Sequence, residues 1–382
     1  IMVSSMGFYP GGAEILPIRF ANELKRLGLS VLFLSAGLHV RENGIRRLLR
    51  NDVPVVETAD PQATKALIEE FGIEVLNSHQ WYIQRYPYLL PDVFDQLLCH
   101  AASLHGMIEY GNEFSFSRDQ LVAADHGVTS WVYTADKNLG PFVQLDVLEH
   151  SRARFIKLPN GMEPPEIKPI QRHEIGIPED AFVLCCVSRA IPEKGWAEAI
   201  AVVEKARAIT GRDIRLILVG NGAVYEEYCR SGIPDFVYLA GFSENSVGHY
   251  AAADMGIMLT RFKSESFPLT IVDCLFAGKP YIATDVGEIR NILTSSGKVA
   301  GEVLQLDDWV VPIDAVTKAL VTFVDKGERY QQATRLAQKV ATQFRIDVVI
   351  EQYINLFKED TRASLAKRSR VNTSLSLSEA KD

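Results

Sequence analysis

Short β-branched and apolar runs alternate with stretches of helical periodicity along almost the whole chain, and no other property of the sequence narrows the choice of fold as far. Such alternation is typical of βαβ units, in which helices connect parallel strands and cover the sheet. The first unit would comprise a strand over 1–5, a Gly-Gly turn, a helix over 13–27 and a strand over 31–35. The sequence therefore predicts an α/β protein built on parallel sheets.

One connector separates two such series. Residues 158–165 contain an Asn-Gly pair that favours a turn and three prolines that exclude a continuous helix. We therefore predict an N-terminal domain over 1–160 and a C-terminal domain over 161–345. We expect a final amphipathic helix at 346–358 and, after it, a polar tail or linker over 361–382.

Composition and charge exclude several classes of function. With 47% hydrophobic and 23% charged residues, the 382-residue chain can bury a sizeable core. Its formal charge of -8 gives no overall attraction to nucleic acid, so an anionic ligand would have to meet a local cluster of cations. No run approaches the roughly 18 to 20 apolar residues of a membrane span. The five cysteines lack metal-like spacing, which predicts a reducing, cytoplasmic compartment and no metal site.

Ligands of open α/β sheets bind at the carboxyl ends of strands, so the loops after strands hold the candidate functional residues. The loop after a strand predicted over 182–188 carries Arg189 and Lys194, five positions apart, and two such cations suit a diphosphate. Solvated loop charges explain them equally well. Glu265 lies just before a predicted helix and Asp273 about one turn into it. Because a helix N-terminus favours phosphate, these carboxylates would suit sugar or ribose hydroxyls, although capping acids are the more common explanation.

Two glycine-rich turns give weaker signals. The turn from Val219 to Gly222 lacks a complete dinucleotide-binding fingerprint, because Tyr225 stands where glycine is needed. Gly11 and Gly12 would let a ligand approach the backbone between the first strand and helix, but a plain tight turn fits equally well.

Two histidines end predicted strands of the N-terminal domain. His79 is more easily explained as a structural residue. His105 is the better candidate for a hydrogen-bonding or proton-handling group, because Gly106 opens space beside it. The sequence contains no G-x-S-x-G or H-E-x-x-H motif.

Eight short motifs, taken in order over roughly residues 1 to 360, resemble the retaining glycosyltransferases of family 4, which have the GT-B fold. Each motif is weak alone, and the ordered set makes the resemblance specific. They are Gly11-Gly12-Ala13-Glu14, His105-Gly106, Pro159-Asn160-Gly161, Arg189-x4-Lys194-Gly195, Val219-Gly220-Asn221-Gly222, Gly241-Phe242, Glu265-x7-Asp273 and Ala277-Gly278-Lys279-Pro280.

The resemblance implies two Rossmann-like, doubly wound domains that face an interdomain cleft, with the last helix crossing back to the first domain. It places a nucleoside diphosphate sugar mostly on the C-terminal domain and the acceptor mostly on the N-terminal one. Arg189 and Lys194 would hold the donor diphosphate, Glu265 the transferred sugar and Asp273 the ribose, and His105 would line the reaction centre. Other contacts to the donor would come from Gly11, Gly12, Gly220, Gly241, Phe242, Ser266, Phe267, Leu269 and Thr270.

The predicted function is metal-independent transfer of a hexose, with retention, from a UDP- or GDP-sugar to a hydroxyl of a glycan, lipid or small molecule. Arg189, Lys194 and the helix N-terminus would stabilise the departing diphosphate. That diphosphate would take the acceptor's proton, so Glu265 would be a sugar anchor and no cofactor would be needed. Asp273 departs from the family, which usually has glutamate there.

Three alternatives remain open. A nucleotide-sugar epimerase or sugar phosphorylase could share the architecture. A catalytically silent nucleotide-sugar-binding or scaffold domain of a larger polypeptide would fit the Asp273 departure and the start of the chain at Ile1 inside an apolar run. The third is peripheral contact with the inner face of a membrane, although a solvated helix face explains the same arginines: Arg41, Arg46, Arg47 and Arg50.

Overall fold

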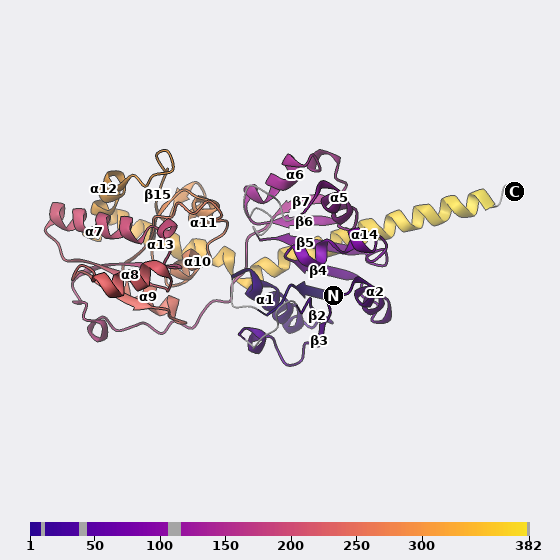
Figure 1. Cartoon of the computed structure of the whole chain (residues 1–382), viewed down its shortest axis with the longest axis horizontal. Helices are drawn as coiled ribbons and strands as arrows, with labels where there is room; N and C mark the ends of the chain where they lie inside the picture. The colour runs from indigo at the N-terminus through magenta and orange to yellow at the C-terminus, as the bar shows by residue number, and fades with distance from the viewer. Residues whose placement is uncertain (9–11, 38–43, 106–115, 380–382) are drawn as a thin grey trace. The chain divides into compact units, whose positions relative to one another are not determined.

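The computed structural model describes residues 1–8, 12–37, 44–105 and 116–379, and the chain divides into two units. Unit 1 comprises Ile1–Glu163 together with Ile346–Asp382, and unit 2 comprises Pro164–Arg345 (Figure 1). The chain therefore leaves unit 1 once and returns to it through its last helix.

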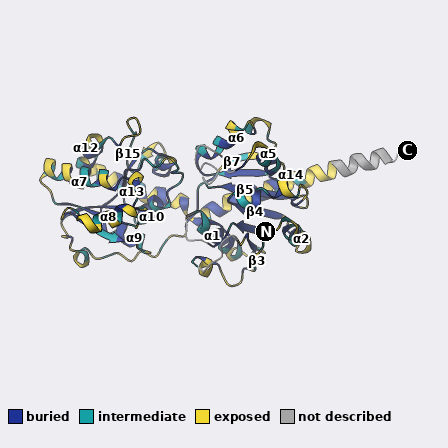
Figure 2. Ribbon diagram, viewed as in Figure 1, coloured by how far each residue is buried: buried dark blue, intermediate teal, exposed yellow. Residues whose placement is uncertain are grey.

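Within the described ranges, unit 1 holds a seven-stranded parallel sheet in the order β3-β2-β1-β4-β5-β6-β7. The strand order reverses between β1 and β4, so the carboxyl ends of these two strands form the switch point at which doubly wound sheets bind ligands. The central strands are buried (Figure 2). The strands are β1 (Met2–Ser5), β2 (Leu32–Ser35), β3 (Val55–Glu57), β4 (Val75–His79), β5 (Cys99–Leu104), β6 (Ser130–Tyr133) and β7 (Arg154–Lys157).

Two helices of unit 1, α2 and α5, begin at side chains that cap them. Asp60 accepts hydrogen bonds from the backbone N–H groups of Gln62 and Ala63, and Ser117 forms a capping box with Gln120. The α-helices are α1 (Gly12–Arg26), α2 (Pro61–Glu70), α3 (Trp81–Gln84), α4 (Tyr86–Leu89), α5 (Arg118–His126), α6 (Gly140–Gln144) and α14 (Ile346–Glu379), with 3-10 turns at Arg46–Leu48, Asp136–Leu139 and Leu148–His150.

The described part of unit 2 holds a six-stranded parallel sheet in the order β10-β9-β8-β11-β12-β15, with the switch point between β8 and β11. All six residues of β8 are buried, as expected for a central parallel strand covered on both faces. The strands are β8 (Phe182–Val187), β9 (Ile214–Val219), β10 (Val237–Gly241), β11 (Met255–Met258), β12 (Tyr281–Thr284) and β15 (Gly301–Leu304), beside a small hairpin of β13 (Thr294–Ser295) and β14 (Lys298–Val299).

Helices cover both faces of this second sheet, and β8, β9, β11, α7 and α12 contribute to one continuous core. The helices of unit 2 are α7 (Trp196–Thr210), α8 (Ala223–Ser231), α9 (Ser246–Ala252), α10 (Leu269–Phe276), α11 (Ile289–Ile292), α12 (Ile313–Val324) and α13 (Glu328–Ala341), with 3-10 turns at Arg172–Ile175, Pro192–Lys194 and Thr342–Phe344.

The last helix is longer than the sequence predicted. We expected a helix over 346–358 and a polar tail over 361–382, but α14 continues as one helix to Glu379. Residues 346–382 contain neither proline nor glycine, so nothing in the backbone chemistry ends the helix where the apolar face ends. No helix in the described ranges is long and apolar enough to cross a membrane.

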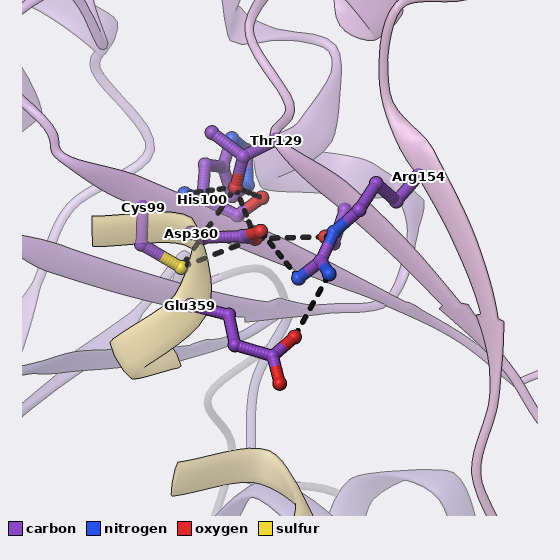
Figure 3. Close-up of polar contacts among 7 residues, drawn as sticks. Cys99, His100, Thr129, Arg154, Glu359 and Asp360 are labelled. Carbon is purple, nitrogen blue, oxygen red and sulfur yellow. Dashed lines mark hydrogen bonds and ion pairs between the residues drawn. The ribbon is translucent and has the colours of Figure 1, made fainter. Parts of the chain in front are cut away.

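Two kinds of contact hold α14 on unit 1. Val349, Ile350 and Tyr353 are buried in the core beside α1 and the sheet. One turn beyond that apolar face, the buried Asp360 carboxylate accepts hydrogen bonds from Thr129 Oγ1 at 2.8 Å and Ser130 Oγ at 2.7 Å. Arg154 Nη2 donates to its other oxygen at 2.6 Å (Figure 3). The helix is thus fixed to the amino ends of β6 and β7.

Candidate functional site

In unit 2 the predicted site residues gather at the carboxyl edge of the sheet, on the loops that follow β8 and β11. Gly195 explains why these loops lie against each other. Its φ is +76°, and a Cβ added there would lie 2.1 Å from the carbonyl oxygen of Leu259. The carbonyl of Glu193 accepts a hydrogen bond from Arg261 N at 2.8 Å. Backbone packing therefore places the end of the first loop beside the second.

Lys194 and Glu265 meet across these loops as a buried ion pair between Nζ and Oε2. Each side chain is only 9% exposed. Within the part of the chain that the structure describes, neither charged group has another hydrogen-bond partner. A buried ion pair that satisfies so little of its hydrogen-bonding capacity is a costly arrangement, because both charges have lost water. The pair therefore leaves hydrogen-bonding capacity for a ligand.

Phe262 brings the second predicted cation into the same cluster. Its ring lies 5.1 Å from Lys194 Nζ and 5.3 Å from the guanidinium carbon of Arg189, distances at which a cation is attracted to an aromatic face. We call Arg189, Lys194, Phe262 and Glu265 the Phe262 cluster. Phe262 was not predicted as a site residue, although it lies between a strand and the candidate carboxylates Glu265 and Asp273.

The chain from Glu265 into α10 is held by backbone contacts. Gly287 has a φ of +58°, and a Cβ there would lie 2.4 Å from the carbonyl oxygen of Glu265. Glu288 N donates to the Ser266 carbonyl at 2.9 Å. Pro268 is the N-cap of α10, so the N–H groups of Leu269 and Thr270 stand at its first turn, where they lack intrahelical acceptors. The structure thus places a helix N-terminus directly after Glu265.

Two other predicted residues of this segment have protein partners. The ring of Phe267 packs edge-on against Phe344, with centroids 5.7 Å apart. Asp273, one turn into α10, accepts a hydrogen bond at its Oδ2 from Ser246 Oγ at 2.9 Å. Ser246 begins α9 and was not singled out from the sequence, because an isolated serine carries no motif.

Gly220, which follows β9, and Gly241, the last residue of β10, allow close packing. Gly220 has a φ of +143°, and a Cβ there would lie 1.9 Å from the carbonyl oxygen of Ser188. Its N–H donates to the Gly241 carbonyl at 2.8 Å. Gly241 has a φ of +71° and would meet the Tyr225 hydroxyl at 3.1 Å if it carried a Cβ. Phe242, which follows it, is 70% exposed.

In unit 1 the two histidines lie together at the carboxyl ends of β4 and β5. His79 Nδ1 and His105 Nε2 are 2.8 Å apart, and the rings are nearly parallel, at 4°. Burial lowers the pKa of His105 to about 4 and that of His79 well below its usual value. Gly12 begins α1, whereas Gly11 and Gly106 lie outside the described residues.

A second polar group at this edge involves Glu14 of α1. Gln80 follows β4 with φ 68° and ψ 156°, a combination that non-glycine residues rarely adopt. Its Nε2 donates to Glu14 Oε1 at 2.9 Å, and its Oε1 accepts from Met6 N at 2.9 Å. Burial raises the pKa of the Glu14 carboxyl. The switch point of unit 1 is therefore lined by amide, imidazole and carboxyl groups.

A cavity of about 750 Å³ lies at the other edge of the unit 1 sheet. It is lined by residues at the amino ends of β6 and β7 and by α14, among them Thr129, Arg154 and Asp360. None of the predicted site residues borders it. Residues that fix α14 thus line this cavity, and Figure 3 shows the contacts among them.

Comparison with known proteins adds evidence of two kinds. The family profile described as "Glycosyl transferases group 1" matches residues 181–325, which contain the Phe262 cluster and Asp273. HepE of Anabaena, solved in complex with UDP, superposes with a TM-score of 0.72 at 17% identity, covering 94% of this chain and 99% of HepE. The paired parallel sheets and this superposition define a protein of the GT-B fold.

Curated relatives extend the match over most of the chain. N-acetyl-alpha-D-glucosaminyl L-malate synthase of Bacillus anthracis is 22% identical, covering 93% of this chain and 96% of the relative. D-inositol 3-phosphate glycosyltransferase of Kineococcus radiotolerans is 24% identical, covering 76% and 77%. Residues 181–325 thus match the group 1 glycosyltransferases, and the chain is a glycosyltransferase with the GT-B fold.

Proposed function

We propose that this glycosyltransferase moves a hexose from a UDP-sugar to an acceptor hydroxyl, with retention of the anomeric configuration. Unit 2 would bind the donor and unit 1 the acceptor. The observation that carries the proposal is the buried Lys194–Glu265 pair, with its unused hydrogen-bonding capacity, beside the N-terminus of α10. UDP is the preferred nucleotide because HepE, which has the same fold, was solved with UDP and with UDP-glucose.

Charge development at the leaving group decides what the cations do. As the bond between the anomeric carbon and the diphosphate oxygen breaks, its electron pair moves to the diphosphate and the sugar acquires oxocarbenium character. Arg189, Lys194 and the first N–H groups of α10 would then meet more negative charge than in the ground state. Interactions that strengthen in this way lower the barrier, whereas uniform binding does not.

The carboxylates would act on neutral hydroxyls. When the diphosphate supplies the counter-charge to Lys194, the oxygens of Glu265 can accept hydrogen bonds from the transferred hexose. Asp273, one turn further along α10, would accept from the ribose. In Asp273 the carboxylate is one methylene shorter than in glutamate, and the 2.9 Å hydrogen bond from Ser246 orients it.

The acceptor step needs no separate protein base. The acceptor hydroxyl would attack the anomeric carbon from the face that the diphosphate leaves, and a diphosphate oxygen would take the hydroxyl proton. One carbon–oxygen bond breaks, one forms, and the products are the glycoside and UDP. The configuration at the anomeric carbon is thereby kept.

Product analysis tests the proposal. The full chain is incubated with UDP-, GDP- and ADP-hexoses and a panel of glycan, lipid and small-molecule hydroxyl acceptors, and the products are examined by proton NMR. We expect UDP release that depends on an acceptor, insensitivity to EDTA, and an α-linked product from an α-linked donor. An inverted product, or a UDP-hexose converted to its epimer without acceptor, would contradict the proposal.

A further inference from the structure

We propose that Asn77 and His79 are positioning residues that fix the tautomer of His105, so that His105 presents an unprotonated Nδ1 to a hydroxyl of the sugar substrates. The tautomer follows from contacts within unit 1. The hydroxyl partner rests on the proposed function.

The orientation of the Asn77 amide is fixed first. Its Nδ2 donates to the carbonyl oxygen of Ala101 at 3.0 Å and to Ser103 Oγ at 3.2 Å. A carbonyl can only accept, so the amide nitrogen must be the atom that faces it. The amide oxygen therefore faces the other way, where it lies 2.8 Å from His79 Nε2.

The amide oxygen in turn fixes the tautomer of His79. An amide oxygen can only accept, so His79 Nε2 carries a proton and donates. Burial holds the pKa of His79 well below its usual value, so the ring is neutral and carries that proton alone. His79 Nδ1 is therefore an acceptor. Edge-on packing against Phe20, with ring centroids 5.2 Å apart, holds the ring in this orientation.

His105 completes the alternation of donors and acceptors. Because His79 Nδ1 accepts, the 2.8 Å contact requires that His105 Nε2 carries the proton. A neutral His105 then has a bare Nδ1. This nitrogen is buried and has no hydrogen-bond partner in the part of the chain that the structure describes. The chain of contacts thus ends in one unused acceptor.

The chemistry of that acceptor defines its ligand. A bare imidazole nitrogen accepts from an O–H or N–H group, and it has no proton to offer a phosphate or carboxylate oxygen. In a glycosyltransferase the matching group is a sugar hydroxyl. Fixing the tautomer in advance avoids reorganisation when the substrate binds, which is how buried polar groups contribute to catalysis.

Nitrogen-15 NMR of the histidine rings tests the tautomers directly in the full chain. His100 is an internal control, because its Nδ1 lies 2.6 Å from the Gly127 carbonyl and its Nε2 lies 2.8 Å from Ser78 Oγ. A carbonyl accepts, so His100 must carry its proton on Nδ1. We expect Nε2–H for His79 and His105 and Nδ1–H for His100. A proton on Nδ1 of His105 at neutral pH would overturn the inference.

Two neighbouring substitutions on β4 test the functional consequence. Asn77→Leu removes the acceptor of His79, whereas Ser78→Ala removes the partner of His100 and leaves the His79–His105 contact intact. We expect Asn77→Leu to give mixed tautomers of His105 and to lower kcat about tenfold, the worth of one hydrogen bond, with little change in donor KM. We expect Ser78→Ala to keep both kcat and the His105 signals. Unchanged His105 signals and kcat in Asn77→Leu would contradict the positioning role.

A second pair of variants covers the case in which Asn77→Leu does not fold. His79→Gln keeps a donor and an acceptor on one side chain, and we expect it to retain most of the turnover. His79→Phe has neither group, and turnover equal to wild type in that variant would overturn the inference. Expected tautomers without any sugar transfer would refute the proposed function and leave the tautomer assignment intact. Sugar transfer with the reversed tautomer would refute the inference alone.

Discussion

Two buried ion pairs lie at opposite ends of β11 and differ in how fully they are satisfied. Asp254 precedes the strand and pairs with Arg172, and Glu265 follows it and pairs with Lys194. Their burial is alike, with side chains 12% and 9% exposed in the first pair and 9% in both members of the second.

The pair at the amino end is saturated. Arg172 also donates to the carbonyls of Ala252, Glu179 and Ala181, and Asp254 also accepts from Val183 N and Lys326. Across the described residues, the pair at the carboxyl end has only itself and the face of Phe262. The same interaction is therefore fully satisfied by the fold at one end of the strand and keeps unused hydrogen-bonding capacity at the other.

Unit 1 shows a similar contrast between the two edges of its sheet. At the amino edge of its sheet, Asp360 accepts from Thr129, Ser130 and Arg154. At the carboxyl edge, the histidine contacts end at His105 Nδ1, which has no partner among the described groups. At these carboxyl edges, unit 2 thus has an incompletely satisfied ion pair and unit 1 an imidazole nitrogen without a partner among the described groups, as expected if one handles a diphosphate and the other orients hydroxyls.

Among these variants, Lys194→Ala should have the largest effect on turnover. Removing a cation that stabilises developing charge should lower kcat roughly 10²- to 10³-fold, measured from initial rates at saturating donor. Because Glu265 is left buried without its counter-ion, the free energy of unfolding should be measured on the same sample. Near-normal turnover in folded Lys194→Ala would show that the assignment of Lys194 to the leaving group is wrong.

Arg172→Met tests the amino end of β11. Leaving Asp254 buried without its guanidinium partner should lower the free energy of unfolding by about 3 kcal/mol, measured by urea titration. The kcat of the folded fraction should stay at the wild-type value, since the pair is far along the strand from the Phe262 cluster. A large loss of kcat with unchanged stability would contradict the assignment of this pair to the fold.

Asp273→Asn tests whether the second carboxylate of unit 2 binds the ribose of the donor. If Asp273 accepts from the ribose, removing its charge should raise the donor KM about tenfold and leave kcat nearly unchanged, the pattern of a lost ground-state interaction. Ser246→Ala is the matched control, because it removes only the hydrogen bond that orients Asp273 and should give a smaller rise. Equal kinetics for Asp273→Asn and wild type would exclude the ribose contact.

The pH dependence of stability tests His100 of unit 1, whose two ring nitrogens both have hydrogen-bond partners. Burial lowers the pKa of His100 to about 4 from its usual 6.5, so the unfolded chain binds more protons between these values. The free energy of unfolding should therefore fall by about 1 kcal/mol on account of His100 between pH 6.5 and pH 5.5. In urea titrations, His100→Gln should show a correspondingly shallower slope. An unchanged slope would mean that His100 is protonated in the folded protein.

Sequence periodicity predicted most of the buried sheet. The strands expected over 31–35 and 182–188 are β2 and β8, each to within one residue, because continuous apolar runs are typical of buried strands. Elements with partly exposed or short apolar runs were not predicted. Among them are β3, which has only three residues, and α13, whose exposed face is polar.

Candidate site residues were predicted from the sequence one by one, and the contacts between them come only from the structure. Motifs placed Lys194 and Glu265 at strand ends, yet their pairing depends on how Gly195 packs against Leu259, a contact between distant segments. From the sequence, each histidine was judged alone, and His79 was the weaker candidate. In the structure the two rings form a hydrogen bond. The position of Phe262 between a strand and the candidate carboxylates could have drawn attention to it, whereas the isolated Ser246 belongs to no motif.

Calorimetric titration of UDP into the two ion-pair variants tests whether the Lys194–Glu265 pair, and not the Arg172–Asp254 pair, binds the donor diphosphate. This measurement needs no acceptor. We expect Arg172→Met to bind UDP as tightly as wild type and Lys194→Ala to bind it at least about tenfold more weakly, since a charge-assisted hydrogen bond is lost. Equal UDP affinity in Lys194→Ala and wild type would contradict the account.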